Sequence, residues 1–362
     1  MTSVVDPPPS GTLRERVLRF AERATTPLLP HDYLDLFAPL RSGADLRGRI
    51  VALHRETREA VTVTIRPGRG WAGHRPGQYI RIGVDVDGVR QWRPYSVTSR
   101  ADSVDGCLTI TAKSIPNGKV SNHLLRHARV GTVIQLDQAQ GDFVLPDQAP
   151  DRVLFVTAGS GITPVMGILR NHLDDLGDVV LLHSAPTADD VVFGPELRRW
   201  NATGALRLVE RHTATEGLLD PTDIGRLVPD FADRATWVCG PTAMLDALEA
   251  HWAAAGAADR LRTERFRPTI VVTGEGGSVR FTKTGVTVDA DAGTPILDAA
   301  ERAGVLMPSG CRMGICYGCV LPLREGAVRD LRNGEITTAV PGDGVKVQTC
   351  ISAAAGTCDI DH

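Results

Sequence analysis

The chain has 362 residues, of which 42% are hydrophobic and 23% are charged, and its formal net charge is −3. The length favours two or three domains, and the composition is ordinary for a globular protein. The charge gives no support for nucleic-acid binding, no apolar run approaches the roughly 18 residues of a membrane span, and Met1–Ser10 lacks a secretory pattern. We therefore expect a cytoplasmic protein.

The first predicted segment, residues 1–46, is an extension in which Leu13–Ala24 has the pattern of a short amphipathic helix. Residues 47–148 are predicted to form a separate domain of short strands. The runs VTVTIRP, QYIRIGVDVDGVRQW and CLTITAK alternate in polarity, and Asp87-Gly88 predicts a tight hairpin. Short strands at close spacing indicate a small antiparallel β-barrel.

Two groups of residues in this domain suit a bound phosphate and ring. Arg93 suits a phosphate, Tyr95 the face of an aromatic ring, and Ser96 a hydrogen bond to a heteroatom. Residues 118–121 (GKVS) open a predicted helix, SNHLLRHA, where backbone amides favour an anion. Each residue taken singly is more often a surface arginine or an ordinary helix cap.

Residues 149–267 change to a strand–turn–helix rhythm, which predicts a parallel sheet wound with helices. The buried run VLFVTAG leads into the turn Gly159-Ser160-Gly161 and a helix, while the strand TWV ends at Cys239-Gly240-Pro241. Open α/β sheets bind ligands at such strand ends, so the two turns together indicate a dinucleotide site. For Cys239 alone, the alternative is a buried structural thiol.

Residues 275–362 are predicted to form a third domain, with a VRFTKTGVTVDA hairpin and a helix over TPILDAAERAG. Its cysteines have the spacing C-x4-C-x2-C-x30-C, formed by Cys311, Cys316, Cys319 and Cys350. This run begins as in plant-type 2Fe-2S proteins, whereas structural zinc sites generally use two C-x2-C pairs. We therefore predict an iron–sulfur cluster and not zinc. Cys358 is a rival fourth ligand, but it is expected to lie in a polar tail.

The three motif sets, in this order, resemble the ferredoxin–NADP⁺ reductase superfamily, in the subgroup with a C-terminal ferredoxin domain. The resemblance covers about residues 47–362. It implies an antiparallel β-barrel flavin domain, an α/β parallel-sheet nicotinamide domain and an α+β (β-grasp) ferredoxin domain. It also implies an NAD(P)H-dependent oxidoreductase that transfers hydride to a flavin and passes single electrons out through the cluster. A related subgroup uses FMN, but the GKVSNHL stretch is more similar to the FAD users, which favours FAD.

Residue roles follow from the same resemblance. Arg93, Tyr95 and Ser96 are expected to contact the flavin through its phosphate, ring face and N5, and Ser121 its pyrophosphate. Glu264 and Phe266 are expected to close the nicotinamide pocket near the flavin, with Cys239 beside the nicotinamide. The predicted catalytic residues are Tyr95, Ser96 and Cys239. The predicted cofactor-binding residues are Arg93, Pro94, Tyr95, Ser96, Lys113, Gly118, Lys119, Val120, Ser121, Gly159, Gly161, Thr163, Ser184, Cys239, Gly240, Pro241 and Phe266.

The sequence indicates the coenzyme and the electron acceptor through fewer residues than the flavin and the cluster. Ser184, with help from Arg207 or Arg211, favours NADPH over NADH. The whole chain resembles actinobacterial reductases that serve membrane acyl-CoA or fatty-acid desaturases, which implies a location at the inner face of the membrane through the partner. The alternatives are the reductase component of a Rieske-type or other oxygenase, and a redox-sensing electron carrier without hydride transfer. The acceptor is expected to dock around Arg312 and Tyr317 in the cysteine loop.

Overall fold

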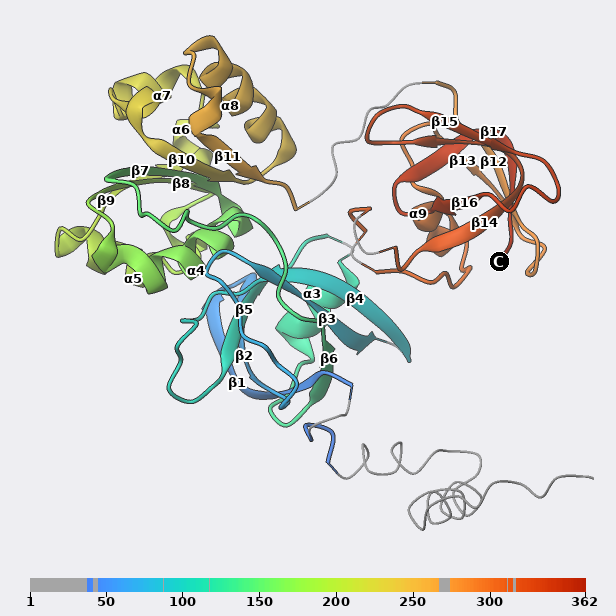
Figure 1. The fold of residues 1–362 in the computed structure, drawn as a ribbon, viewed down its shortest axis with the longest axis horizontal. Coiled ribbons are helices and arrows are strands. Elements are labelled where there is room, and N and C mark those ends of the chain that lie inside the picture. Colours follow the sequence, from blue (N-terminus) through green and yellow to red (C-terminus); the bar gives the residue numbers. More distant parts are fainter. Residues whose placement is uncertain are drawn as a thin grey trace, which may run out of the picture.

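The computed structural model describes residues 38–41, 45–86, 88–116, 118–266, 274–310, 312–314 and 317–362. The helix predicted at Leu13–Ala24 and the cluster ligands Cys311 and Cys316 lie outside these residues. Three sheets organise the described chain, and Figure 1 shows them as three separate bodies. No helix in these ranges is both long and apolar enough to cross a membrane.

The first sheet is antiparallel, with the strand order β4-β3-β6-β1-β2-β5. Its strands are β1 (Arg47–Thr57), β2 (Ala60–Pro67), β3 (Tyr79–Val86), β4 (Val89–Ser96), β5 (Leu108–Lys113) and β6 (Val133–Leu136). After β4 the chain returns to β5, where Val97 bridges Ile110 and the amide of Thr98 donates to the carbonyl of Thr109 at 2.8 Å. This pairing closes the sheet into the predicted barrel.

Alternating residues of these strands fill the barrel. Val63 and Ile65 of β2 and Ile80 and Ile82 of β3 are all fully buried in one cluster. The helix α3 (Lys119–Arg126) packs Val120 and Leu124 onto the same cluster. Because these two residues lie on one side of the helix, the other side faces away from the barrel.

The second sheet is parallel, with the order β11-β10-β7-β8-β9. Its strands are β7 (Arg152–Ala158), β8 (Asp178–Ala185), β9 (Arg207–His212), β10 (Ala235–Cys239) and β11 (Leu261–Glu264). The helices are α4 (Ile162–His172), α5 (Gly194–Ala202), α6 (Thr213–Glu216), α7 (Thr222–Leu227) and α8 (Thr242–Ala254). The strand order reverses between β7 and β10, so the predicted turns at residues 159–161 and 239–241 meet at the switch point.

Both faces of the parallel sheet are covered, which explains its unbroken apolar runs. Val153 and Phe155 belong to a core with α4 and α5, whereas Leu154 and Val156 belong to a core with α7 and α8. Figure 1 shows α4 and α5 on one side of the sheet and α7 and α8 on the other.

The third sheet is mixed, with the order β13-β12-β17-β14-β15 and β16 paired to β14. Its strands are β12 (Gly277–Phe281), β13 (Thr287–Ala290), β14 (Val320–Asp330), β15 (Ile336–Ala339), β16 (Lys346–Gln348) and β17 (Ser352–Ile360). The helix α9 (Ile296–Arg302) packs Ile296, Leu297 and Ala300 against this sheet. The arrangement is the predicted α+β ferredoxin fold.

The sequence prediction for Cys358 was wrong. This residue does not lie in a polar tail but in β17, paired with β12 and β14, and its side chain is buried in the domain core. Burial raises the pKa of its thiol to about 12. The polar neighbours point the other way, where Asp359 pairs with Arg280 and Asp361 with Arg324.

The barrel and the parallel sheet are joined by polar contacts from the end of α4. Arg170 Nη1 donates to the carbonyl of Thr98 at 2.7 Å, and Asn171 Nδ2 donates to the carbonyl of Ser99 at 3.2 Å. Asn171 Oδ1 in turn accepts from the amide of Ala101 at 2.8 Å. Because α4 begins at the turn after β7, these bonds fix that turn relative to the barrel.

Candidate functional site

A cavity of about 1590 Å³ lies where the three sheets meet. The barrel contributes β4 and the start of α3, the parallel sheet contributes the end of β11 and the start of α4 and α8, and the ferredoxin domain contributes α9 and the cysteine loop. In Figure 1 the ferredoxin domain lies beside the β4 side of the barrel. The cavity therefore brings parts of all three predicted cofactor sites to one place.

The end of β4 supplies a hydroxyl without a hydrogen-bond partner and a guanidinium without an ion pair among the described residues. Ser96 is only 3% exposed, and its buried Oγ has no hydrogen-bond partner among the described residues. Arg93 forms no ion pair with a described residue; its Nη1 donates to the carbonyl of Trp92 at 2.7 Å. Burial, with a smaller contribution from Arg312, lowers the pKa of Arg93 to about 10. A buried hydroxyl and a desolvated cation are both costly without a partner, and a flavin ring and its phosphate would satisfy them. These residues fit a flavin.

Tyr95 lies between these two groups in the strand and also lines the cavity. Burial raises the pKa of its hydroxyl, an effect that Arg93 partly offsets. The phenol therefore stays neutral and offers an aromatic face to a ring.

The start of α3 forms the next part of the wall. Gly118, Lys119, Val120 and Ser121 all line the cavity. A Cβ on Gly118 would lie 2.5 Å from Ser121 Oγ and 2.6 Å from Ile115 Cγ1, so any other residue here would displace the side chains of Ser121 and Ile115. The first amides of a helix have no acceptor within it, and here they border a cavity that also contains Arg93. This end of α3 fits the phosphate end of a flavin.

Lys113, at the end of β5, extends toward the parallel sheet. Its Nζ would lie 4.0 Å from a Cβ built on Gly159, and its charge contributes to lowering the pKa of His183 on β8. Lys113 therefore lies between the flavin cavity and the turn after β7.

Four polar residues stand side by side across the ends of the parallel strands. In register, His183 of β8 neighbours Thr157 of β7, Thr157 neighbours Cys239 of β10, and Cys239 neighbours Glu264 of β11. His183 Nδ1 and Thr157 Oγ1 share a hydrogen bond of 2.8 Å. Residues in register point to the same face, so this row forms a polar edge beneath the Gly159 turn.

Burial keeps every titratable member of this row uncharged at neutral pH. It lowers the pKa of His183 to about 3, raises that of the Cys239 thiol, and raises that of Glu264 to about 8. Glu264 also lines the cavity, and its Oε2 has no partner among the described residues. The carboxyl is therefore a protonated, unpaired group directed at the place where the flavin and nicotinamide are expected to meet.

Gly161 determines how closely the two turns approach. A Cβ on it would lie 2.0 Å from the carbonyl oxygen of Cys239, so any side chain would push β10 away from α4. Thr163, two residues later, lines the cavity, and its hydroxyl donates to the carbonyl of Ser160 at 3.0 Å. The predicted nicotinamide turns are thus packed against each other.

The cysteine loop forms the ferredoxin side. Cys319 and Cys350 are buried, and Thr349 donates to the carbonyl of Cys319 from its amide at 3.2 Å and its hydroxyl at 3.0 Å. Arg312, Gly314 and Tyr317 have left-handed backbones, with φ of 60°, 76° and 56°. Repeated left-handed turns let a short loop fold around a compact group. The buried thiols and this loop fit an iron–sulfur cluster.

Arg312 faces inward, contrary to the predicted docking surface. Its guanidinium donates to Asp298 Oδ1 at 2.9 Å and pairs with Glu301, and all three residues line the cavity. Tyr317, by contrast, is 69% exposed. Of the two residues, only Tyr317 is largely exposed.

Not every predicted site residue reaches the cavity, and some residues that reach it were not predicted. Cys239 and Ser184 are buried and do not line it, and neither do the turn residues Gly159, Gly161, Gly240 and Pro241. Lining residues that the sequence did not indicate include Tyr79, Ser160, Thr242, Met313 and Arg332. Tyr79 pairs with Ser96 across β3 and β4, so the hairpin register was the one signal that could have identified it.

Three features together define a flavin-dependent electron-transfer reductase. The barrel holds unpaired groups that fit a flavin, the parallel sheet has a switch point that suits a dinucleotide, and the third domain has two buried cysteines beside a tightly turned loop. Three family models match the chain in the same order: "Oxidoreductase FAD-binding domain" over residues 67–145, "Oxidoreductase NAD-binding domain" over 155–250, and "2Fe-2S iron-sulfur cluster binding domain" over 279–355.

Relatives extend over nearly the whole chain. An NADPH oxidoreductase of Mycobacterium tuberculosis is 49% identical over 350 residues, covering 95% of this chain and 91% of that protein. The glycine betaine monooxygenase reductase subunit of Pseudomonas aeruginosa is 30% identical over 321 residues, covering 80% and 87%. The solved phthalate dioxygenase reductase has the same fold, with a TM-score of 0.60, 20% identity, and coverage of 87% of this chain and 97% of that one.

The chain belongs to the ferredoxin–NADP⁺ reductase superfamily, in the group with a C-terminal 2Fe-2S domain. It is an NAD(P)H-dependent oxidoreductase with FAD and a 2Fe-2S cluster.

Proposed function

We propose that this reductase takes hydride from NADPH and delivers single electrons to a protein acceptor, in the first instance an acyl-CoA or fatty-acid desaturase. The observation that supports the route is the shared cavity, because Ser96, Glu264 and Met313 come from three domains and line one space. When bound, the flavin accepts an electron pair and releases single electrons, which the cluster takes one at a time.

The residues of the chain supply position and electrostatics in this route. Arg93 and the amides at the start of α3 hold the phosphates, Tyr95 covers the ring, and Ser96 Oγ hydrogen-bonds the ring edge. Lys113 and the Gly159–Gly161 turn hold the dinucleotide, and Glu264 and Phe266 close the pocket.

The preference for NADPH is supported by the name of the 49% identical relative. The two residues that were predicted to contact the 2′-phosphate, Ser184 and Arg211, give this preference less support. Ser184 is buried, and Arg211, which faces Ser184 across β8 and β9, already donates to the carbonyls of Gly217 and Glu216 and pairs with Asp223. A 2′-phosphate contact must therefore come from other groups or displace these bonds. Comparison of kcat/KM for NADPH and NADH tests the preference, and equal or better values with NADH overturn it.

The acceptor is proposed from the resemblance of the whole chain to reductases that serve desaturases. An oxygenase is the second candidate, supported by the 30% identical reductase subunit of a monooxygenase. Purified reductase should be combined with NADPH and either a membrane desaturase or a Rieske-type oxygenase from the same cell. Substrate turnover by the desaturase alone supports the proposal, and turnover by the oxygenase alone replaces it with the second candidate.

A further inference from the structure

Two arginines of the ferredoxin domain line the central cavity, Arg312 and Arg332. Arg312 is shared by two carboxylates, those of Asp298 and Glu301. Arg332 has one acidic partner among the described residues, Asp330, and its side chain is 43% exposed. The two arginines therefore differ, because the carboxylates bound to Arg312 exceed its charge, whereas Asp330 only balances that of Arg332.

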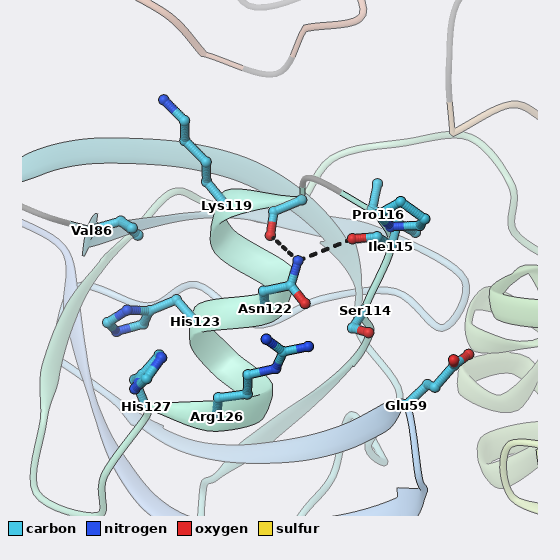
Figure 2. Close-up of a pocket in the computed structure, with 11 residues that line it drawn as sticks. Glu59, Val86, Ser114, Ile115, Pro116, Lys119, Asn122, His123, Arg126 and His127 are labelled. Atoms are coloured by element: carbon cyan, nitrogen blue, oxygen red, sulfur yellow. Dashed lines mark hydrogen bonds between the residues drawn. The ribbon is translucent and has the colours of Figure 1, made fainter.

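The other cationic side chains in the described wall of this cavity belong to the other two domains. They are Arg93, Lys113, Lys119, Arg262 and Arg265. Lys119, for example, extends from the start of α3 (Figure 2). The positive charge that the ferredoxin domain itself brings to the described wall thus comes from Arg312 and Arg332.

Asp330 holds the guanidinium of Arg332 by one edge. Nε donates to Asp330 Oδ1 at 3.1 Å, and Nη2 donates to Oδ2 at 2.7 Å. The carboxylate is itself fixed, because its Oδ1 also accepts from the backbone amide of Arg332 at 2.8 Å. A pair with two parallel bonds fixes the direction of the guanidinium plane. The remaining nitrogen, Nη1, donates to no described residue.

This free nitrogen lies against the cysteine loop. Arg332 Nη1 would be 3.1 Å from a Cβ built on Gly314, so it is next to the backbone of that residue. Gly314 lies between the predicted ligands Cys311 and Cys316 in the sequence, and its carbonyl accepts from Gln348 Nε2 at 3.0 Å. The loop is therefore fixed at the point where the guanidinium meets it.

The fourth predicted ligand is close to the same arginine. Cys350 is buried and lines the central cavity together with Arg332. The pKa of Arg332 is raised chiefly by its hydrogen bonds to Asp330, and also by Tyr317 and Cys350 nearby. The guanidinium thus lies within electrostatic reach of both segments that supply the predicted ligands.

A cation at this place has a definite effect on electron uptake. A 2Fe-2S cluster on four thiolates becomes more negative by one charge when it takes up one electron, and net charge and hydrogen bonds near the sulfurs set the potential of such clusters. A fixed positive charge therefore stabilises the reduced form more than the oxidised form. Asp330 binds the other edge of the guanidinium, so the positive end of the pair is the one nearer to Gly314.

We propose that Arg332 raises the reduction potential of the cluster, with Asp330 as the residue that directs its guanidinium at the cysteine loop. The inference rests on the proposed route from flavin to cluster, in which the cluster has to accept electrons from the flavin. It concerns a side chain that is neither a predicted ligand of the cluster nor a predicted contact of the flavin.

The test is a redox titration of the full chain with both cofactors bound and no acceptor present. The cluster potential is read from the EPR signal of the reduced cluster, and the flavin potential from absorbance. In Arg332→Gln the cluster should bind its electron about tenfold less tightly than in the wild type, which for one electron is a shift of about 59 mV to lower potential. Arg332→Lys keeps the charge and should shift the potential less than Arg332→Gln.

The matched control is Arg324→Gln. Arg324 is another arginine of the ferredoxin domain that pairs with one aspartate, Asp361, but it does not line the cavity. Its removal changes the net charge by the same amount, so this variant should keep the wild-type cluster potential. An equal shift in Arg324→Gln and Arg332→Gln would overturn the proposal, because the effect would then follow from net charge alone.

The remaining outcomes also decide. An unchanged or higher cluster potential in Arg332→Gln overturns the proposal, and so does an equal shift of the flavin and cluster potentials. Arg332→Met is a second neutral variant, and loss of iron from both neutral variants would show that the arginine holds the loop together and does not tune the cluster. A wild-type cluster that dithionite reduces and NADPH does not would instead contradict the proposed route from the flavin.

Discussion

Arg93 of the barrel and Arg312 of the cysteine loop line the same central cavity, and the charge of Arg312 helps to lower the pKa of Arg93. Arg312 is neutralised by Asp298 and Glu301 on α9, whereas Arg93 pairs with no described carboxylate. This cluster of one arginine and two carboxylates carries a net charge of −1, but both carboxylates are held by Arg312, so Arg93 stays available for a phosphate.

Removing Arg312 should disturb this balance. In Arg312→Ala, Asp298 and Glu301 are released close to Arg93 and compete with the flavin phosphate for it. We expect weaker flavin retention and transfer from flavin to cluster slowed by about tenfold or more, since small misplacements are costly at a reacting pair. Rapid-mixing absorbance with NADPH measures both, and Arg312→Lys, which keeps the charge, should be milder.

Tyr317→Ala is the contrasting variant: it should leave electron transfer from flavin to cluster intact and raise KM for the protein acceptor. Wild-type internal transfer in Arg312→Ala would remove the role assigned to this residue.

Substitution of two buried cysteines, one at a time, tests which of them is the fourth ligand of the cluster. Cys350 follows β16 beside the cysteine loop, whereas Cys358 lies in the core of the sheet between β12 and β14. Cys350→Ala should lose iron, and Cys358→Ala should retain two irons per chain because its side chain only fills space. Iron analysis of anaerobically prepared protein reads the result. Full iron content in Cys350→Ala together with loss in Cys358→Ala would reverse the assignment.

Gly161→Ala should damage the nicotinamide site without touching the flavin. The new methyl group would lie 2.0 Å from the carbonyl oxygen of Cys239, so α4 and β10 must separate, at a cost of roughly 1–3 kcal/mol in stability. KM for the coenzyme should rise while flavin content stays normal. Gly225→Ala in α7 is the control, because its added methyl meets only Phe231 at 3.8 Å and should be neutral or stabilising by roughly 0.5–1 kcal/mol. A Gly161→Ala chain with wild-type melting temperature and KM would contradict the packing of the two turns.

Glu264 predicts a dependence of stability on pH. Burial raises its pKa from 4.5 to about 8, so between these values the folded chain holds a proton that the unfolded chain has released. Its contribution is therefore fully present below pH 4.5 and is lost as the pH rises through about 8. Glu264→Gln is uncharged throughout, and its melting temperature relative to wild type should increase between about pH 5 and about pH 9. A difference that is constant over this range would show that the carboxyl is not buried as described.

The elements that depend on local sequence could be predicted. Asp87-Gly88 indicated the β3–β4 hairpin, in which Gly88 has φ 78° and Val86 pairs with Val89. The unbroken apolar run at 153–156 indicated a strand buried on both faces. The position of Cys358 could not be predicted from the sequence. Its strand, β17, pairs with β12, and β12 begins 75 residues before β17 does. The polar residues next to Cys358, Asp359 and Asp361, point outward and pair with arginines from other strands. Such long-range partners cannot be identified from the sequence alone.

The sequence motifs identified many residues of the site but not their arrangement in space. The motifs identified Arg93, Tyr95, Ser96 and the start of α3, all of which line the cavity. They could not show that Arg312 turns inward to Asp298 and Glu301, because both partners come from α9. Nor could they show the row from His183 to Glu264, which exists only because four strands align their ends.

Electrons are expected to enter the protein through the flavin and to leave it through the cluster. The most direct measurement compares wild type with Cys316→Ser in two assays, NADPH-to-ferricyanide activity and reduction of the protein acceptor. Ferricyanide draws electrons from the flavin, so the variant should keep this activity while losing transfer to the acceptor. Arg93→Ala should lose flavin and both activities. Full turnover of the acceptor by Cys316→Ser would contradict the account, since electrons would then leave by a route that bypasses the cluster.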